Sequence, residues 1–403
     1  MLKKIALGAV TVLLLSGVIC CGPEDETDGR GPTTTDQGVT DSSAGTGVAG
    51  STSTANGLYQ NGVDGSPLLA LIQSATKSLD IEIYEMSDTA VKNAVLAALG
   101  NGIAVRLVYE PQLVGSQCAG FTTSTTDCSG DTDFLSHFQS AGGQAAPFNK
   151  QMCGYDTGCV EHGKMILVDG TTAMVSTGNF AASSLCDAAD SPSVCNVDYS
   201  YILTDAAPVA ALEQIFSNDL AQTVYDVSAI ATPVSGRVTV SPVTSDDLVS
   251  FVSTARTSIT IENQYLHYPA LNSALTTAAG NGVQVTVIVA SLCSFGTPSK
   301  SDVNEWNEYM GGLSNGGVTA LAYTLSQKID GFNGYMHAKT IVVDGTSAWI
   351  GSVNGSKAAF EDNREFGVYL TDPGEVQKLA AAQQAHFAGG TDWSVNATCK
   401  GTE

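Results

Sequence analysis

One short motif occurs twice in this chain of 403 residues, and its two copies lie at a constant separation. Residues 162–169 read His-Gly-Lys-Met-Ile-Leu-Val-Asp, and residues 337–344 read His-Ala-Lys-Thr-Ile-Val-Val-Asp. An Asn lies ten positions after the Asp of each copy (179 − 169 and 354 − 344). The His, Lys, Asp and Asn positions are each displaced by 175 between the copies (337 − 162). This duplication predicts a chain built from two related structural units.

The repetition also includes the segments before each motif. In the first half, residues 78–84 alternate like a β-strand, residues 89–99 have helical spacing, and residues 103–109 are typical of a second strand. The matching segments of the second half are displaced by 180 (258 − 78) and cover residues 258–262, 271–279 and 283–289. Strands that alternate with helices predict an α/β fold. We therefore expect two pseudo-symmetric repeats, each a mixed β-sheet flanked by helices, packed together.

Each motif is itself expected to form a tight hairpin. Residues 165–168 and 340–343 are short apolar runs that end at Asp-Gly, and residues 173–176 and 348–350 follow as second strands. Because side chains two positions apart lie on one face of a strand, the His and Lys of each motif are expected to face the same way. Two His and two Lys suit a reaction at phosphorus, in which one His attacks and the other donates a proton.

The N-terminus has the pattern of an export signal. An apolar run over residues 5–19 follows two Lys and precedes Cys20 and Cys21, and its 15 residues (19 − 5 + 1) are too few for a typical membrane-spanning helix. We expect a signal peptide over residues 1–21, of the lipoprotein type with the lipid on Cys21 or Cys20. The residues before either Cys depart from the usual lipoprotein pattern, so plain secretion stays an alternative. In both cases we expect an exported protein, in the cell envelope or secreted.

Three further segments follow the expected signal. Residues 22–56 have hardly any large apolar side chain and are expected to form a flexible linker. The first repeat is expected over residues 57–230 and the second over residues 237–399, because residues 232–236 (Thr-Pro-Val-Ser-Gly) interrupt the pattern between them. We expect the chain to act as a monomer.

The charge of the chain bears on its partners. It has 17 Lys and Arg against 40 Asp and Glu, which gives a net charge of −23. Extended contact with a nucleic-acid backbone needs clustered basic residues, so this balance argues against a nucleic-acid partner. A local cationic pocket is still compatible with it.

The ten Cys residues are typical of a protein from an oxidising compartment. Two of them belong to the expected signal, and an even number remains for disulfides. The short spacings favour the pairs 118–128, 153–159 and 186–195, which leaves 293–399. Metal binding is the alternative, but the spacings lack the paired clusters of structural zinc sites. We expect no metal and no cofactor.

The two motifs resemble those of the phospholipase D superfamily, whose pattern reads His-x-Lys-(x)4-Asp-(x)6-Gly-Ser-x-Asn. The second copy matches every fixed position, and the first has Ser176 and Thr177 where the pattern has Gly and Ser. The superfamily also has Asn-x-Glu downstream of each motif, which resembles residues 363–365 (Asn-Arg-Glu) and residues 196–198 (Asn-Val-Asp). The resemblance covers roughly residues 57–399.

This resemblance implies one active site shared by the two repeats, and a phosphohistidine intermediate. It suggests His162 as nucleophile and His337 as acid, although pseudo-symmetry leaves the reverse open. Lys164 and Lys339 are expected to be catalytic by stabilising the phosphate oxygens. The other side chains expected to bind the phosphate are Asn179, Asn354, Thr177 and Ser352.

Four carboxylates complete the expected site. Asp198 and Glu365 are expected to orient the histidines, and the shorter Asp198 is expected to need a backbone shift for this contact. Asp169 and Asp344 are counted with the catalytic residues, and a structural role in the turn is the alternative.

We therefore expect an exported phospholipase D-like phosphoric diester hydrolase with a phospholipid partner at a membrane surface. It would release phosphatidic acid and also transfer the phosphatidyl group to alcohols. The alternatives are a secreted metal-independent endonuclease of the same superfamily and a catalytically decayed surface protein that binds lipid or phosphate. Transfer of the cardiolipin-synthase type is a further alternative, against which the export signal and the lack of expected spanning helices argue.

The other His residues lack such a motif context. His267 follows a second-half strand, where members of the superfamily carry substrate contacts, so it stays a weaker candidate. Tyr84, Glu85 and Tyr265 lie at strand ends near the expected site, where packing in the core or at the rim is the simpler interpretation.

Overall fold

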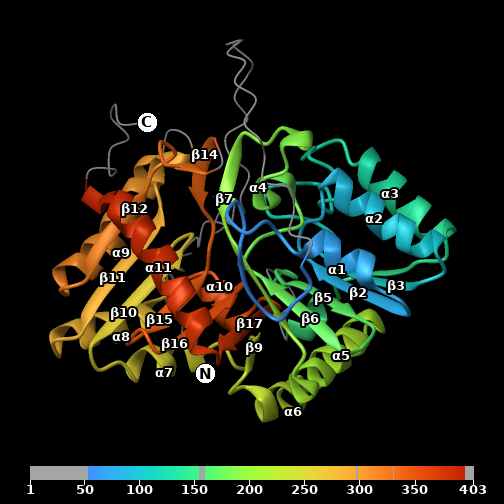
Figure 1. Cartoon of the computed structure of the whole chain (residues 1–403). Coiled ribbons are helices and arrows are strands. Elements are labelled where there is room, and N and C mark those ends of the chain that lie inside the picture. Colours follow the sequence, from blue (N-terminus) through green and yellow to red (C-terminus); the bar gives the residue numbers. More distant parts are fainter. Residues whose placement is uncertain (1–52, 154–158, 296–297, 330, 395–403) are drawn as a thin grey trace, which may run out of the picture.

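The computed structural model describes residues 53–153, 159–295, 298–329 and 331–394. Within these residues, each half of the sequence forms one large mixed β-sheet (Figure 1). The first sheet has seven strands in the order β1 (Gly57–Gln60), β8 (Tyr199–Leu203), β6 (Thr172–Ser176), β5 (Lys164–Val168), β2 (Ser78–Ile83), β3 (Ala104–Tyr109) and β4 (Gln144–Pro147). The second has eight strands in the order β18 (Thr391–Asp392), β12 (Thr319–Tyr323), β11 (Gln284–Ala290), β10 (Ser258–Asn263), β15 (Thr340–Val343), β16 (Ser347–Gly351), β17 (Glu365–Leu370) and β9 (Val238–Ser241).

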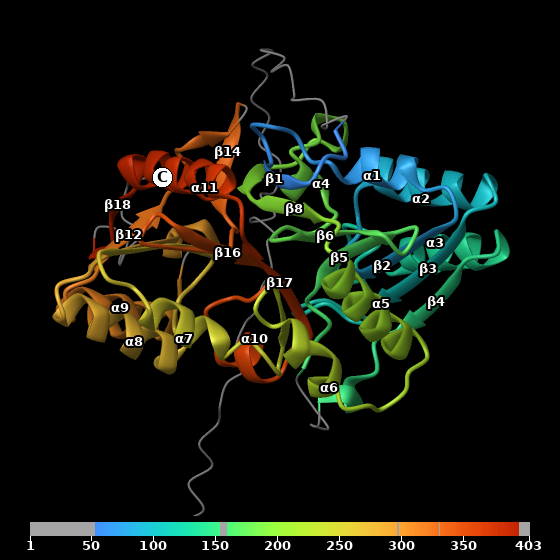
Figure 2. The same cartoon turned by 60° about the horizontal axis from the view of Figure 1, so that its bottom comes forward.

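Helices flank both sheets (Figure 2). Those against the outer face of the first sheet are α1 (Leu68–Ser74), α2 (Thr89–Gly100) and α3 (Ser129–Ser140), and those against the second are α7 (Asp247–Ser253), α8 (Pro269–Gly280) and α9 (Lys300–Asn315). Two long helices, α5 (Ala206–Leu220) and α11 (Pro373–Gly389), pack into the core between the sheets. The short elements are α4 (Ala182–Leu185), α6 (Ser228–Ala231), α10 (Lys357–Glu361), η1 (Lys150–Cys153), η2 (Ala188–Asp190), η3 (Thr232–Val234) and η4 (Leu292–Phe295). The predicted α/β fold of two mixed sheets with flanking helices is confirmed.

The repeated strands and helices form where the sequence predicted them. The helix α2 begins after Asp88, whose carboxylate accepts a hydrogen bond from the Val91 N–H at 2.9 Å. It ends before Gly102, which has φ +82°, a left-handed conformation that suits a residue without Cβ. The helix α8 ends in the same way before Gly282, at φ +89°.

A small third sheet joins the two halves, and the sequence pattern did not predict it. It consists of β13 (Lys328–Ile329), β14 (Phe332–Met336) and β7 (Val194–Val197). β7 belongs to the first half and β14 to the second, and the two strands pair in parallel. This pairing fixes the relative position of the two halves next to the motifs.

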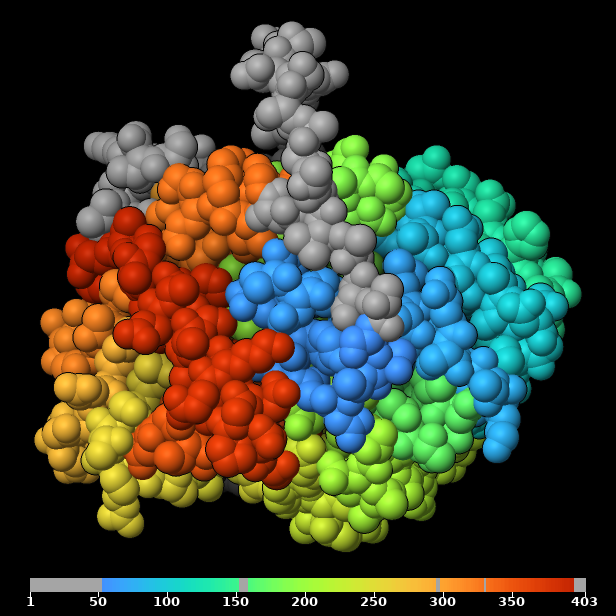
Figure 3. Space-filling model, in the orientation of Figure 1, coloured from blue at the N-terminus to red at the C-terminus, as the bar shows by residue number. Residues whose placement is uncertain are grey.

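Apolar side chains from both sheets also share one central core. Buried within it, the guanidinium of Arg364 lies 3.0 Å from a carboxylate oxygen of Asp219 on α5. On the surface, α11 lies beside the N-terminal described residues (Figure 3). The Leu58 N–H donates there to Glu375 at 2.9 Å. The halves are therefore held together by apolar packing and by buried and surface polar contacts.

Two of the predicted disulfides are confirmed, those of Cys118 with Cys128 and of Cys186 with Cys195. Residues 159 and 293 are also disulfide-bonded cysteines. Their predicted partners fall outside the side chains that the structure describes, so those two pairings stay predictions. The expected signal and most of the expected linker also lie outside the described residues. Among the described residues, the helices are too short or too polar to span a bilayer.

Candidate active site

The imidazole of His162 lies directly before β5 and is held by a carboxylate from the second half. Its Nδ1 is 2.9 Å from Oε1 and 2.8 Å from Oε2 of Glu365, the first residue of β17. Both side chains are buried, at 1% and 0% exposure. Because a carboxylate accepts hydrogen bonds, this contact places the ring proton on Nδ1 and leaves Nε2 as the reactive nitrogen.

His337, in the second half, has the corresponding contact with a carboxylate of the first half. Its Nδ1 is 2.9 Å from Oδ1 and 3.1 Å from Oδ2 of Asp198, a residue of the first half. Burial alone would raise the pKa of Asp198, but the charge and hydrogen bond of His337, the charge of Lys339 and the hydroxyl of Thr177 outweigh it and lower the pKa. The expected shorter reach of Asp198 therefore does not prevent a close contact.

Parallel backbone pairing aligns both His–carboxylate pairs. β14 and β7 run side by side, and His337 and Asp198 are the residues that follow these strands. An isolated parallel bridge between residues 161 and 364 lies one position before His162 and Glu365. In sequence, Glu365 follows the second motif, yet the structure places it against the histidine of the first. Each half of the chain thus supplies the carboxylate that contacts the motif histidine of the other half.

The two motif lysines are fully buried beside their histidines. Lys164 Nζ donates to the carbonyl oxygen of His162, and Lys339 Nζ to that of His337, both at 2.7 Å. Lys339 Nζ also lies 3.0 Å from Nε2 of His337 and 3.2 Å from the carbonyl oxygen of Thr177. An ammonium group only donates, so this contact again corresponds to a ring proton on Nδ1. The His and Lys of each motif share one side, as predicted, although β15 begins only after Lys339.

The motif asparagines also lie where the two halves meet, and their neighbours differ between the halves. Asn179 Nδ2 donates to a carboxylate oxygen of Glu85 at 3.3 Å, whereas Asn354 Nδ2 donates to the hydroxyl of Tyr265 at 3.1 Å. Glu85 and Tyr265 are equivalent positions of the repeat (265 − 85 = 180). Packing in the core or at the rim was the simpler prediction for them, and the structure places both against an expected phosphate ligand.

The hydroxyls of Thr177 and Ser352, which were predicted to bind the phosphate, contact neighbouring residues of the site. Thr177 Oγ1 donates to Asp198 at 2.7 Å, and Ser352 Oγ donates to the carbonyl oxygen of Phe366 at 3.2 Å. Each hydroxyl has one proton to donate, and these contacts use it. These contacts position Asp198 and the strand that begins at Glu365, and phosphate binding by the two hydroxyls stays a prediction.

The structure also separates Asp169 and Asp344 from the histidines. Each lies in the turn at the far end of its motif strand, at φ +54° and +53°. Asp169 accepts the backbone N–H groups of residues 76–78, and Asp344 those of residues 256–258. Burial opposes ionisation, but these donors lower the pKa of each carboxyl to about 2. These contacts favour the structural alternative over a catalytic role.

The first motif departs from the superfamily pattern at Ser176, and local hydrogen bonds accommodate this residue. Ser176 Oγ donates to the carbonyl oxygen of Tyr199 at 3.2 Å and accepts the Gly178 N–H at 3.1 Å. A Cβ on Gly178 would lie 2.4 Å from Oδ2 of Asp198, so this glycine is required for the close approach of the carboxylate.

Two aromatic rings beside the histidines were missed or undervalued by the sequence patterns. Tyr84 packs edge-on to His162 at 5.0 Å between ring centroids, and Tyr335 stacks on His337 at 6.3 Å. The weaker candidate His267 instead pairs through Nδ1 with Glu305 on α9 at 2.9 Å. Its place in an apolar stretch two residues before a motif histidine was the available signal for Tyr335.

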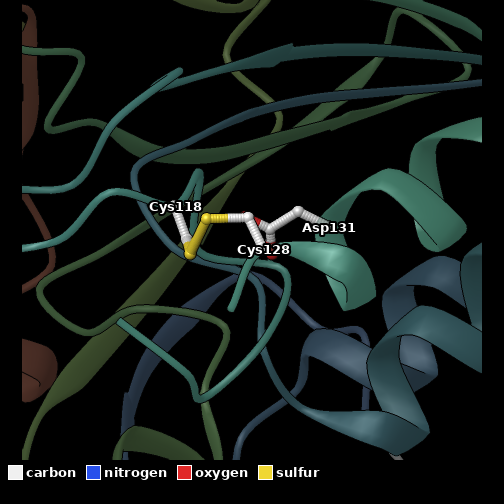
Figure 4. A group of neighbouring side chains, drawn as sticks. All are labelled: Cys118, Cys128 and Asp131. Carbon is white, nitrogen blue, oxygen red and sulfur yellow. A yellow bond between two sulfur atoms is a disulfide. The ribbon is translucent and has the colours of Figure 1, made fainter. Parts of the chain in front are cut away.

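One group of described residues has a spacing that could hold a metal ion, namely Cys118, Cys128 and Asp131 (Figure 4). The two sulfur atoms are joined in a disulfide, so neither is a free thiolate ligand. The Asp131 carboxylate accepts the N–H groups of Ala119 and Phe121 at 2.5 and 3.0 Å. This group therefore holds a loop.

The groups gathered here are those that suit a nucleophile, a general acid and an anionic substrate. Two imidazoles have their Nδ1 atoms held by carboxylates, so a bond or a proton is transferred at Nε2, which in His337 also lies 3.0 Å from Lys339 Nζ. Two buried lysines and two asparagines supply positive charge and N–H donors for anionic oxygens.

Comparison with known proteins agrees with this geometry. A family model described as "Cardiolipin synthase, PLD-like domain" matches residues 68–220 and 248–388, more than half of the chain. The chain is 30% identical over 148 residues to a probable cardiolipin synthase, YwiE, of Bacillus subtilis (strain 168), a match that covers 36% of this chain and 26% of that protein. It is 29% identical over 135 residues to a cardiolipin synthase of Listeria welshimeri serovar 6b, covering 33% of this chain and 26% of the relative. The matches span about a quarter of the length of these relatives.

Two solved structures have a similar fold over most of the chain. Phosphatidylserine synthase from Haemophilus influenzae Rd KW20 has a TM-score of 0.57 at 12% identity, covering 82% of this chain and 85% of that one. Polyphosphate kinase from Porphyromonas gingivalis has the same TM-score and identity, covering 83% of this chain and 50% of that one. At this identity the likeness concerns the fold alone.

Proposed function

Since the chain belongs to the phospholipase D superfamily, we propose that it is an exported phosphodiesterase that breaks the ester between a phospholipid phosphate and its head-group alcohol. The phosphatidyl group passes first to a histidine and then to water, which gives phosphatidic acid, or to a second alcohol, which gives a new phospholipid. One observation carries this proposal: two buried imidazoles at one junction, each held at Nδ1 by a carboxylate of the other half.

The proposed reaction has two displacements at phosphorus. In the first, Nε2 of one His forms a bond to phosphorus, the bond to the head-group oxygen breaks, and the other His gives its Nε2 proton to that oxygen. In the second, this His takes a proton from water or an alcohol, whose oxygen attacks phosphorus while the P–N bond breaks. The superfamily resemblance favours His162 as nucleophile and His337 as acid, a role in which Nε2 of His337 carries a proton in place of the hydrogen bond that it accepts from Lys339. Buried Lys164 and Lys339 stabilise the negative charge on the remaining oxygens.

A lipid substrate has support beyond the site. The curated relatives are named as cardiolipin synthases and one structural neighbour as a phosphatidylserine synthase, names that favour lipid substrates and transfer alongside hydrolysis. The net charge of −23 argues against an extended nucleic-acid contact. For the location, we propose action outside the cytoplasm, with the chain tethered through lipid on Cys21 or Cys20. Its disulfides support an oxidising compartment.

The test measures head-group release from vesicles of phosphatidylglycerol, phosphatidylethanolamine or phosphatidylcholine, with EDTA present and with or without added ethanol. His162→Asn and His337→Asn are each expected to lower kcat by about a hundredfold to ten-thousandfold. His137→Asn is the matched control, because His137 is exposed on α3. Full lipid activity in both motif variants would sink the proposal.

Two additional measurements separate the alternatives. Degradation of plasmid DNA in EDTA without lipid turnover would favour the nuclease. An acid-labile phosphate adduct trapped on His162 or His337 would exclude a decayed binding protein and identify the nucleophile.

A further inference from the structure

The backbone on either side of His162 is held by a buried glutamate, Glu161. One carboxylate oxygen of Glu161 accepts the N–H of Gly163 at 2.6 Å, so this side chain spans the two residues that flank the histidine. The backbone N–H of Glu161 donates in turn to a carboxylate oxygen of Glu110 at 2.9 Å. Glu161 is completely buried. Its contacts therefore fix the short segment from which the imidazole of His162 projects.

The second copy of the motif differs at both residues of this contact. Met336 corresponds to Glu161, and Ala338 corresponds to Gly163 (336 − 161 = 175 and 338 − 163 = 175). A Cβ on Gly163 would lie 2.5 Å from Oε1 of Glu161, so the glycine suits the presence of the carboxyl. Met336 is also completely buried. An apolar side chain thus fills this place in the second copy, and the carboxyl of Glu161 is a feature of the first.

A second glutamate, Glu82 of β2, is buried beside Glu161. Among the residues that the structure describes, no N–H or hydroxyl group donates to either oxygen of Glu82 or to Oε2 of Glu161. The carboxyl of Glu82 nevertheless lies within hydrogen-bonding reach of the carboxyls of Glu161 and Asp219. Two carboxyl groups form a hydrogen bond only if one of them carries a proton. The contact between Glu82 and Glu161 therefore requires a shared proton.

The positive charge that faces this pair is already engaged. Arg364 directs its buried guanidinium to Asp219 at 3.0 Å, so the three carboxyls of Asp219, Glu82 and Glu161 share one cation. Their full ionisation would leave two uncompensated negative charges in the interior (3 − 1). Burial outweighs the charge of Arg364 and raises the pKa of Glu161 to about 8 and that of Glu82 well above its usual range. Other titratable groups packed nearby are Tyr225, Glu110, Lys150 and His162.

The second half gives the corresponding carboxyl a different partner. Glu262 corresponds to Glu82 (262 − 82 = 180), and its Oε1 lies 2.5 Å from Nδ1 of His386 on α11. The hydroxyl of Thr340 also donates to Glu262 at 3.2 Å. Glu262 thus contacts a side chain that can carry a positive charge, whereas Glu82 contacts two further carboxyls. The carboxyl pair with a shared proton accordingly distinguishes the half that carries His162.

We propose that Glu161 is a positioning residue for His162, and that it holds the histidine in place while the pair of Glu82 and Glu161 keeps its shared proton. With the proton present, Glu161 stays on the Gly163 N–H and the imidazole keeps its position for reaction at phosphorus. Loss of the proton leaves two negative carboxylates side by side in the interior, where the low dielectric strengthens their repulsion. Glu161 then moves away from Gly163. The inference rests on the proposed function, because it concerns a reacting histidine of that site.

The test compares two substitutions of similar size at one position. Glu161→Gln keeps an oxygen for the Gly163 N–H and does not ionise, whereas Glu161→Met fills the space without that acceptor. Glu161→Met is expected to lower kcat on phosphatidylglycerol micelles at pH 7 by about tenfold to a hundredfold, with KM within about twofold. Glu161→Gln is expected to keep kcat within about threefold. Glu308 is exposed on α9, and Glu308→Met is the matched control. Equal kcat values for the two Glu161 variants would show a space-filling role and overturn the inference.

NMR of the histidine ring separates this inference from the proposed function, because it needs no turnover. In protein labelled with 15N at the His rings, the Nδ1–H signal of His162 is assigned by its loss in His162→Asn. At pH 7 this signal is expected to keep its wild-type position in Glu161→Gln and to be displaced in Glu161→Met. As the pH rises through about 8, the wild-type signal is expected to shift further than that of Glu161→Gln.

These signals support the positioning role even if no diester is cleaved and the proposed function fails. The inference is overturned if His162 gives the same signal in the wild type and in Glu161→Met. It is also overturned if the wild type and Glu161→Gln respond identically to pH. The wild-type titration decides the question if Glu161→Met does not fold, because a His162 signal that stays constant between about pH 6 and about pH 9 would contradict a shared proton.

Discussion

Glu365 lies 2.8 Å from Nδ1 of His162, although 203 positions of sequence separate the two residues. Asp198 lies 2.9 Å from Nδ1 of His337 in the same way, across 139 positions. Each half thus supplies the carboxylate that orients the histidine of the other half. Neither motif histidine has its orienting carboxylate in its own half, so the site depends on the contact between the halves.

Removal of either carboxylate charge is expected to disable the site without unfolding the protein. Glu365→Gln and Asp198→Asn keep the shape of the side chain but present an N–H₂ group or a weaker acceptor to Nδ1, so the ring loses its fixed orientation. We expect kcat to fall by about a hundredfold, with KM within about twofold. Steady-state rates on phosphatidylglycerol micelles measure this.

Glu361→Gln is the matched control, since Glu361 pairs with Lys357 on the exposed face of α10. It is expected to keep wild-type kcat. Wild-type rates in both carboxylate variants would contradict a positioning role for these residues.

The buried ion pair of Arg364 with Asp219 is expected to stabilise the contact between the halves. Asp219→Ala leaves a charged guanidinium in the core, at a cost of about 3–5 kcal/mol in the free energy of unfolding. Urea denaturation measures it. Asp205→Ala breaks an exposed pair with Arg237 and is expected to cost about 1 kcal/mol or less. Equal losses in the two variants would rule out a special role for the buried pair.

The turn carboxylates Asp169 and Asp344 are expected to affect acid stability and not catalysis. Their pKa values fall from 3.8 to about 2 on folding, so their stabilisation is complete above about pH 4 and is lost as the pH falls towards 2. Asp169→Asn and Asp344→Asn are expected to lower Tm near neutral pH, and the difference from wild type should shrink as the pH falls. Their kcat is expected to stay within about twofold. A large loss of kcat at unchanged Tm would instead support a catalytic role.

Glu161 is expected to make the folded protein less stable as the pH rises, which is the opposite of the effect of Asp169 and Asp344. Burial raises its pKa from 4.5 to about 8, so the folded protein binds a proton that the unfolded chain releases. The stabilisation is complete below about pH 4.5 and declines as the pH rises towards 8. Glu161→Gln keeps an acceptor for the Gly163 N–H and should flatten the fall in unfolding free energy between about pH 5 and pH 8. Parallel curves for wild type and variant would refute this.

Sequence patterns that span about ten positions predicted much of the local structure of this protein. The hairpin of residues 164–176 follows from an apolar run, an Asp-Gly turn and a second apolar run, all local features. The helix α2 follows from the helical spacing of residues 89–99. The disulfide of Cys118 with Cys128 follows from short spacing. The contact of Thr177 with Asp198 was not predicted, because the same hydroxyl can serve a phosphate or a neighbouring carboxylate.

The sequence by itself determined that two equivalent His-Lys motifs lie at the start of equivalent strands, because the repeat preserves both the residues and their local conformation. Only the tertiary structure decided which carboxylate serves which histidine, because the parallel pairing of β7 with β14 aligns His337 with Asp198 across the two halves. It also decided that Glu85 and Tyr265, equivalent in sequence position, face the site as a carboxylate and a phenol. Such contacts depend on the register between distant strands, which no local pattern encodes.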